Sequence, residues 1–183
     1  MTELELIEKL RIAEVPFENW GTGKAKTVGH LLEEVNAGET VLEERDGTLL
    51  RQVDVAMVDV FYHPEGGDSL YLREDRQVFN DGRERPRTLD SSLGEKRHPD
   101  ETFEEAAERG VRTELGIPAE DLEFTPKGVT TRGPEESPSY PGLQTLYTFH
   151  RSAVTLPEEL YRPDGYVEVG GDKTTYFTWQ SQT

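Results

Sequence analysis

Acidic side chains and glycines recur in the segment 94–117, which reads GEKRHPDETFEEAAERGVRTELGI. Its pattern predicts a helix from about Glu101 to Leu115 that ends at Gly116, with the apolar residues on one side and most acids on the other. Hard divalent cations take oxygen ligands, and carboxylates one helical turn apart can face one metal ion. The segment therefore predicts an amphipathic helix with an acidic side.

The segment resembles the Nudix signature, which is Gly, five residues, Glu, seven residues, Arg-Glu, an aliphatic residue, any residue, Glu-Glu, any residue, Gly and an aliphatic residue. Three positions depart from it: Glu95 stands at the first Gly, Gly110 at the Glu after Arg, and Thr113 at the first Glu of the pair. The matching positions are Glu101, Arg109, Val111, Glu114, Gly116 and Ile117.

The resemblance implies the α/β class, with a Nudix-type α/β/α sandwich around a mixed β-sheet. It also implies that glutamates of the helix bind Mg²⁺ or Mn²⁺ and orient a water that cleaves a diphosphate. In this chain Glu114 becomes the expected catalytic residue and metal ligand, supported by Glu101 and Arg109. Because two acids are missing, metal affinity should fall, and a replacement is expected from Glu95 or from the loop containing Glu135 and Glu136.

Gly110 is unusual for the middle of a helix, because glycine there is less favourable than alanine by about 0.8–1.0 kcal/mol. Its presence indicates either close packing against a neighbouring element or a ligand that approaches the backbone. The sequence favours close packing.

Several residues outside the segment are candidates for binding substrate. Lys24 and Lys26 lie on a glycine-rich turn before a predicted helix and could hold an anion, or they could be ordinary solvated lysines. Arg83, Arg85 and Arg87 would share one face of a strand and could bind phosphate oxygens, or they could pair with surface acids. Tyr140 could present its ring for stacking on a planar ligand, although a packed loop tyrosine fits the pattern better.

The rest of the chain predicts an N-terminal helical extension, residues 1–47, followed by a Nudix-like domain, residues 48–183. Helices are expected over 2–14, with Leu4, Ile7 and Leu10 inward, and over 27–37. A β-rich run from Leu49 to Phe61 and a hairpin partner at 70–72 begin the sheet. A polar connection at 73–87, strands near 88–93, 122–131, 143–149 and 174–179, and a loop at 133–142 complete the prediction.

Composition narrows the classes of partner. The formal net charge of -17 at pH 7 disfavours a nucleic-acid polymer or an anionic membrane, and an acidic, lysine-poor surface would suit a high-salt cytoplasm. The chain contains no cysteine, which excludes disulfides and thiolate chemistry. Its N-terminus lacks the features of a signal peptide, so a cytoplasmic protein is expected. The amphipathic N-terminal helices could also form a homodimer.

Two functions remain open on the sequence alone. The chain could be a Nudix-like hydrolase of a small molecule linked to a nucleoside diphosphate, acting through metal-assisted attack of water. It could instead be a binding module for a phosphorylated metabolite that has kept the fold without the metal chemistry. A carboxylate within reach of Glu114 would favour the hydrolase.

Overall fold

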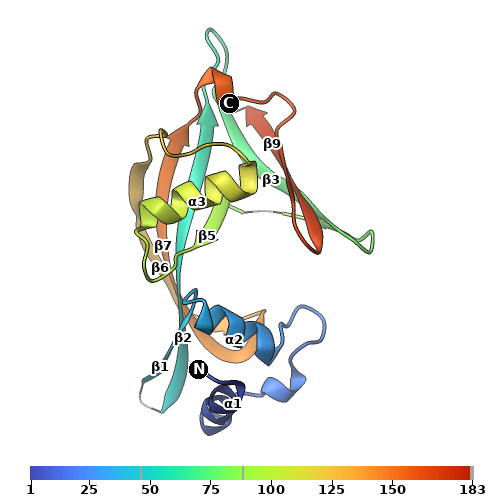
Figure 1. Cartoon of the computed structure of the whole chain (residues 1–183), viewed down its shortest axis with the longest axis vertical. Helices are drawn as coiled ribbons and strands as arrows, with labels where there is room; N and C mark the ends of the chain where they lie inside the picture. Colours follow the sequence, from blue (N-terminus) through green and yellow to red (C-terminus); the bar gives the residue numbers. More distant parts are fainter. Residues whose placement is uncertain (46, 88, 182–183) are drawn as a thin grey trace. The chain divides into compact units, whose positions relative to one another are not determined.

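The computed structural model describes residues 1–45, 47–87 and 89–181. These residues form three α-helices and a nine-stranded mixed sheet with the path β6-β7-β2-β3-β9-β8 (Figure 1). The α/β class and mixed sheet are confirmed. The helices are α1 (Glu3–Ile12), α2 (Val28–Asn36) and α3 (Phe103–Leu115), and the strands are β1 (Val41–Arg45), β2 (Thr48–Tyr62), β3 (Leu70–Phe79), β4 (Glu84–Pro86), β5 (Leu93–Lys96), β6 (Thr125–Ser137), β7 (Tyr140–Thr155), β8 (Tyr166–Val169) and β9 (Lys173–Ser181).

The chain divides into two compact units, and the long strands β2, β6 and β7 contribute residues to both. Unit 1 comprises Met1–Val55, Lys96–Glu101 and Val129–Phe149, and unit 2 comprises Ala56–Glu95, Thr102–Gly128 and His150–Thr183. Unit 1 thus takes in more of the chain than the helical extension that the sequence predicts. The domain boundary at residue 47 stays a prediction. No helix in the described part of the chain is long and apolar enough to cross a membrane.

Unit 1 builds its core from α1, α2 and parts of the long strands. Leu6, Leu10, Leu31 and Tyr140 are fully buried there. Thr2 caps α1 through a reciprocal pair of hydrogen bonds with Glu5, which satisfies free backbone donors at the helix N-terminus. The predicted inward face of α1 is wrong at Leu4, which is 80% exposed, because Leu6 takes its place against the core.

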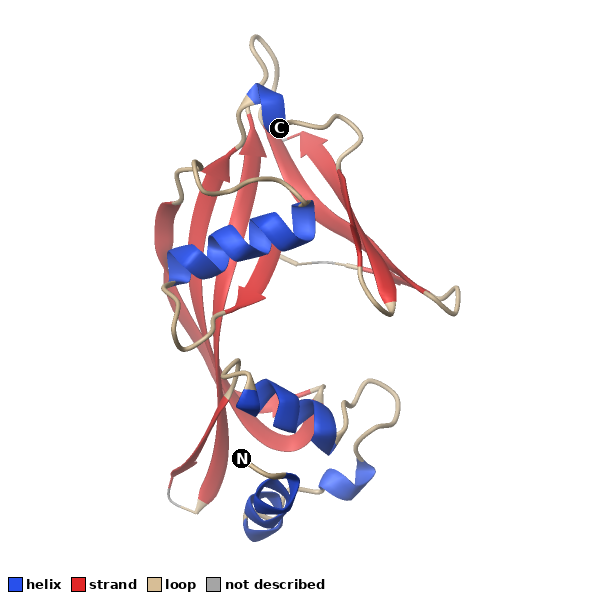
Figure 2. Cartoon of the chain, in the orientation of Figure 1, coloured by secondary structure: helices blue, strands red, loops and turns tan. Residues whose placement is uncertain are grey.

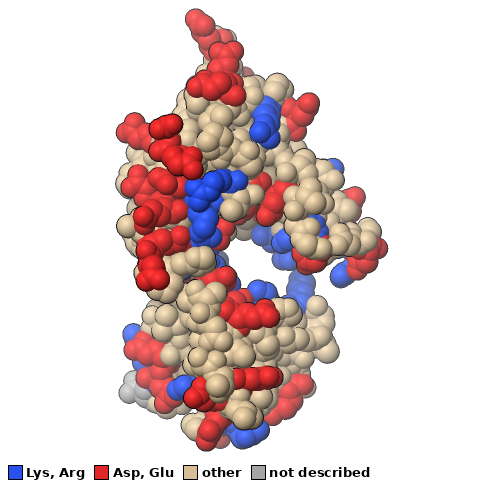
Figure 3. Space-filling view, viewed as in Figure 1, with Lys and Arg blue, Asp and Glu red and all other residues tan. Residues whose placement is uncertain are grey.

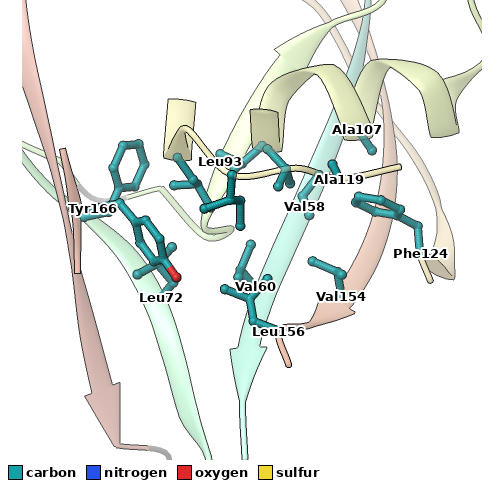
Figure 4. Close-up of a cluster of buried hydrophobic side chains, with 14 of the residues drawn as sticks. Val58, Val60, Leu72, Leu93, Ala107, Ala119, Phe124, Val154, Leu156 and Tyr166 are labelled. Atoms are coloured by element: carbon teal, nitrogen blue, oxygen red, sulfur yellow. The ribbon is translucent and has the colours of Figure 1, made fainter. Parts of the chain in front are cut away.

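Unit 2 packs α3 against one face of its part of the sheet (Figure 2). Alternate residues of β2 and β7 point toward the helix, as the two-residue period of a strand requires, and Figure 4 shows them meeting Ala107 and Phe124. In the described part of unit 2, α3 is the only α-helix. The buried cluster includes Val58, Val60, Leu72, Leu93, Val154, Leu156 and Tyr166.

The boundaries of α3 follow from its sequence. Thr102 accepts from the backbone N–H of Glu105, whose carboxylate accepts from the N–H of Thr102, so the helix begins with a capping box. Gly116 ends it in the left-handed conformation, with φ of 63°.

Several predicted strands have different bounds in the structure. β3 continues to Phe79 through half of the predicted polar connection, and the predicted loop at 133–142 is instead a hairpin of β6 and β7. Of the strand predicted at 88–93, Thr88 lies outside the described residues and only Leu93 belongs to β5. The sequence did not predict β1 or β8, which are short and add to existing strands.

Candidate active site

A pocket of about 240 Å³ within unit 2 lies between the end of α3 and the sheet. Glu114 enters it from α3, Glu95 from β5, Glu74 from β3 and Glu168 from β8. The remaining lining includes the cations Arg87 and Lys173 and the polar side chains Gln77, Thr113 and Thr175. Two distant parts of the sequence thus bring acids to the acidic helix.

Strand pairing places the acids of the sheet in this pocket. Glu168 of β8 lies opposite Thr175 of β9 in antiparallel register. In β3, the register against β9 shifts between Glu74 and Arg76. An extra residue at such a bulge changes which side chains share a face, and Gln77 joins Glu74 in lining the pocket.

Glu114 lies in a strongly negative environment. Burial, followed by the charges of Glu95, Glu168 and Glu74, raises the pKa of Glu114 well above its ordinary value, and Lys173 only partly opposes them. Burial and like charges both disfavour an ionised carboxylate. A bound cation would relieve both effects, so this carboxylate has the electrostatic character of a metal ligand.

Two of the neighbouring acids already have cationic partners. Glu95 forms a 2.7 Å ion pair with Arg109 of α3, and both side chains are about one-fifth exposed. Glu74 forms a 2.9 Å ion pair with Arg87 and accepts a hydrogen bond from Gln77. Among residues 1–45, 47–87 and 89–181, no three His, Cys, Asp or Glu side chains form a ready-made metal centre.

Gly110 packs tightly against β5. A Cβ atom at this position would lie 3.0 Å from Leu93 Cδ1 and 3.1 Å from Glu95 Cβ. Real Cβ atoms rarely approach so closely, so the close packing predicted for Gly110 is confirmed. The Cβ of Glu95 thus lies next to the position that the Cβ of any other residue at 110 would occupy. The chain has Gly where the signature has Glu, and Glu where it has Gly, and the two exchanged positions are in contact.

Thr113 stands at the second missing acid and lines the pocket with a neutral hydroxyl in place of a carboxylate. This hydroxyl donates its proton to the backbone carbonyl of Arg109 at 2.9 Å, as hydroxyls within helices commonly do.

Glu101, the third expected catalytic residue, orients the loop before α3. Its carboxylate accepts a 2.7 Å hydrogen bond from the backbone N–H of His98, and its carbonyl accepts from Arg97. Glu101 belongs to unit 1, whereas the pocket consists of unit 2 residues. Its catalytic role stays a prediction.

Except for Arg87, the predicted substrate-binding residues are not among those that line the pocket around Glu114. Tyr140 is fully buried in unit 1 beside Trp20, so its ring is not available to a ligand and the stacking role is corrected. Lys26 pairs with Glu34 in unit 1 at 2.7 Å, and Lys24 is exposed in the same unit. Arg83 pairs with Asp81, and Arg85 is exposed on β4. The phosphate-binding roles of these four cations stay predictions.

The replacement acids predicted from the loop lie outside the pocket. Glu135 and Glu136 are exposed on β6 in unit 1, where Glu135 pairs with Arg132 at 2.8 Å. Sequence reasoning named Glu95 correctly as a neighbour of Glu114 and included Arg87 among its possible phosphate ligands, but it missed Glu74, Glu168 and Lys173. One signal was available for Glu74, which lies two residues after the core residue Leu72 and so on the same strand face.

No protein-family model matches the chain, and neither does any curated protein. Solved structures do match. An Ap4A hydrolase of C. elegans in a binary complex is 15% identical with a TM-score of 0.42, over 70% of this chain and 79% of that one. A MutT/nudix family protein of Enterococcus faecalis is 15% identical with a TM-score of 0.44, over 99% and 56%. The NUDIX domain of Shewanella oneidensis NrtR, complexed with ADP ribose, is 8% identical with a TM-score of 0.38, over 71% and 73%.

These structural neighbours are Nudix proteins. Their identities and TM-scores are low, so they assign neither a substrate nor site residues to this chain. Its chemistry has to be argued from its own pocket.

Proposed function

We propose that this chain is a Nudix-like hydrolase that cleaves a small molecule linked to a nucleoside diphosphate. The observation that carries the proposal is the contact between Gly110 and Glu95. The acid that the helix lacks at residue 110 is supplied from β5 at the same place, beside Glu114. The exchange therefore keeps two carboxylates in the pocket although the signature is broken at both positions.

The donor atoms suit a hard cation. Glu114 and Glu95, with Glu74 and Glu168 nearby, offer carboxylate oxygens, which Mg²⁺ and Mn²⁺ prefer. We propose Glu114 and Glu95 as the ligands. When bound, the cation would neutralise charge on the diphosphate and lower the pKa of a coordinated water.

The other residues of the pocket have complementary roles. Arg109 holds Glu95 in place through its 2.7 Å ion pair. Lys173 and Arg87 line the same pocket and would bind phosphate oxygens, which stabilises negative charge on the leaving group. Glu168, on the opposite wall, is a candidate general base for the attacking water.

A panel of nucleoside diphosphate derivatives with Mg²⁺ or Mn²⁺ tests the proposal. Metal-dependent turnover by the wild-type chain should fall by at least about 100-fold in Glu114→Gln, since general acid–base and electrostatic groups contribute factors of this size. Glu104→Gln is the matched control, because Glu104 is an exposed acid on the same helix. It should keep full activity.

The alternative is a binding module for a phosphorylated metabolite. It is favoured by the arginine partners of Glu95 and Glu74, which already neutralise two of the acids without a metal ion. Tight binding of the same compounds without turnover under any metal would establish the module and exclude the hydrolase. Turnover that Glu114→Gln leaves unchanged would exclude the proposed site.

A further inference from the structure

A second and larger hollow, of about 460 Å³, lies on the other face of the unit 2 sheet. Val58 and Val60 of β2, like Val154 of β7, pack into the core beneath α3. Because successive side chains of a strand point to opposite faces, Phe61 and Ala153 face away from that helix. They line the hollow, which is therefore separate from the pocket around Glu114.

One wall of the hollow is aromatic. The rings of Phe61 and His63 are almost parallel, with 6° between their planes and 6.3 Å between their centroids. Tyr71 packs at an angle against Phe61 at 5.2 Å and holds it in place. Phe61 and His63 thus line the hollow with aromatic rings, and an aromatic ring is a surface on which a planar ligand can stack.

The floor of the hollow is open because of a small residue and a fixed neighbour. Ala153 is 8% exposed and lies between Arg151 and Thr155 on the outward face of β7. The guanidinium of Arg151 is held by Asp59 through hydrogen bonds of 2.7 and 2.9 Å. This ion pair holds the guanidinium of Arg151 at Asp59. The small side chain of Ala153 leaves the space beside it unfilled.

The rim of the hollow is polar. Lys127 supplies a cation there and Glu123 a carboxylate. Thr125 and Thr155 add hydroxyls that can donate to or accept from oxygen atoms. In a chain of net charge -17, Lys127 is one of few lysines and offers a partner to an anionic group.

We propose that this hollow binds a nucleoside monophosphate. The base stacks on the wall of Phe61 and His63, the phosphate lies at Lys127, and the threonine hydroxyls contact the sugar or the phosphate. The volume falls in the range of about 300–1,000 Å³ that small-molecule pockets occupy, and it exceeds what a free phosphate ion needs. A second copy of the chain fits less well, because the centre of a dimer contact is normally packed and depleted in charge.

Titration with adenosine 5′-monophosphate, adenosine and inorganic phosphate, each without metal and in the presence of EDTA, tests the proposal. The monophosphate should bind more tightly than either of its parts. Amide resonances of Thr125, Lys127 and Thr155 should shift in its NMR titration. Shifts confined to residues around Glu114, or no binding by the monophosphate at millimolar concentration, would overturn the proposal.

Variants separate the contributions of shape and charge. Ala153→Leu fills the floor and should weaken binding by at least about tenfold. Lys127→Gln removes the cation and should weaken binding by about fivefold, the size of one exposed charge interaction. Lys9→Gln, the same change at a lysine of unit 1 that pairs with Glu44, should have no effect. Equal affinities of Lys127→Gln and Lys9→Gln, or a monophosphate-independent dimer that Ala153→Leu abolishes, would refute the assignment.

Discussion

The reciprocal exchange of Glu95 and Gly110 predicts that the two positions are energetically coupled. Three variants test this: Gly110→Glu, Glu95→Gly, and the double variant that restores the signature at both positions. The first inserts a side chain whose Cβ would lie 3.1 Å from Glu95 Cβ and 3.0 Å from Leu93 Cδ1. Overpacking of this kind costs about 1–3 kcal/mol. The second removes an ion-pair partner of Arg109 and places a glycine in β5, each change costing about 0.5–1 kcal/mol.

In the double variant the carboxylate introduced at position 110 can occupy the space that Glu95 vacates. The close approach to Glu95 Cβ disappears, and only the end of a flexible leucine side chain has to move. The double variant should therefore be more stable than the sum of the single changes by about 1–2 kcal/mol, within the range measured for residues in contact. Its Mn²⁺ affinity should recover to within a few-fold of wild type, whereas Glu95→Gly alone should lose about tenfold.

Urea unfolding of the four proteins measures the stability coupling, and isothermal titration calorimetry with Mn²⁺ measures the functional one. Glu104→Gln is the control, because it removes an exposed acid of α3 that does not line the pocket and does not belong to the capping box of Thr102 and Glu105. Additive stabilities, within about 0.3–0.5 kcal/mol, would show that the two positions do not substitute for each other. A double variant that binds Mn²⁺ no better than Glu95→Gly would refute the reasoning on the metal site.

Two further predictions concern buried acids. Burial and like charges raise the pKa of Glu114 above its unfolded value, so its ionisation destabilises the metal-free protein as pH rises above about 4.5; Glu114→Gln should accordingly raise the melting temperature at pH 8 but not at pH 4, as differential scanning calorimetry would show. Burial of Glu34 is outweighed by Lys26, Arg51 and Lys96, which lower its pKa from 4.5 to about 2, so its stabilisation is present above pH 4.5 and lost as pH falls toward 2. Glu34→Gln should cost about 3 kcal/mol in urea unfolding at pH 7 and much less at pH 2.5; an equal cost at both would contradict the role of its charge.

The sequence predicted best those elements whose local signals agree with their tertiary environment. Helix α3 carries a capping box, an apolar face and a terminal glycine, and all three operate in the structure. α2 likewise follows its prediction within a residue at each end. In α1 the helix was right but its face was wrong, because Leu4 and Leu6 offer two apolar stripes and only tertiary packing selects Leu6.

The strands were harder because their partners supply the decisive interactions. β3 continues through the polar residues 73–79 because β9 pairs with it along its whole length. β8 has only four residues. The shared face of Tyr166 and Glu168 can be recognised only once β9 pairs with the strand and the pocket is known. Long-range pairing of this kind leaves little trace in local sequence.

The candidate site was predictable where one segment carries it and not where the sheet completes it. Glu114, Arg109 and Glu95 lie within twenty residues of one another; the structure places Glu114 and Glu95 in one pocket and pairs Arg109 with Glu95. Glu74 and Glu168 come from strands far along the chain, and a bulge in β3 sets the face of one of them. Tyr140, which the sequence pattern favoured as a packed tyrosine over a stacking surface, is fully buried in unit 1.

The acidic surface around α3 also bears on how the pocket meets its ligand. Figure 3 shows acidic side chains gathered on the face of unit 2 that carries this helix. Negative charge there repels a free diphosphate at low ionic strength, and salt screens that repulsion over about 10 Å at 0.1 M. A substrate already complexed with a divalent cation would approach with a smaller negative charge.

The contact between Gly110 and Glu95 has a consequence for how such a site could arise by mutation. From a chain with Gly at 95 and Glu at 110, losing the acid at 110 first would leave the pocket short of a carboxylate. Gaining the acid at 95 first would force two side chains into space that holds one. On the proposed function, either single step would weaken the site or crowd its packing, whereas the exchange of both residues would do neither. Neither position could then revert alone without the same cost.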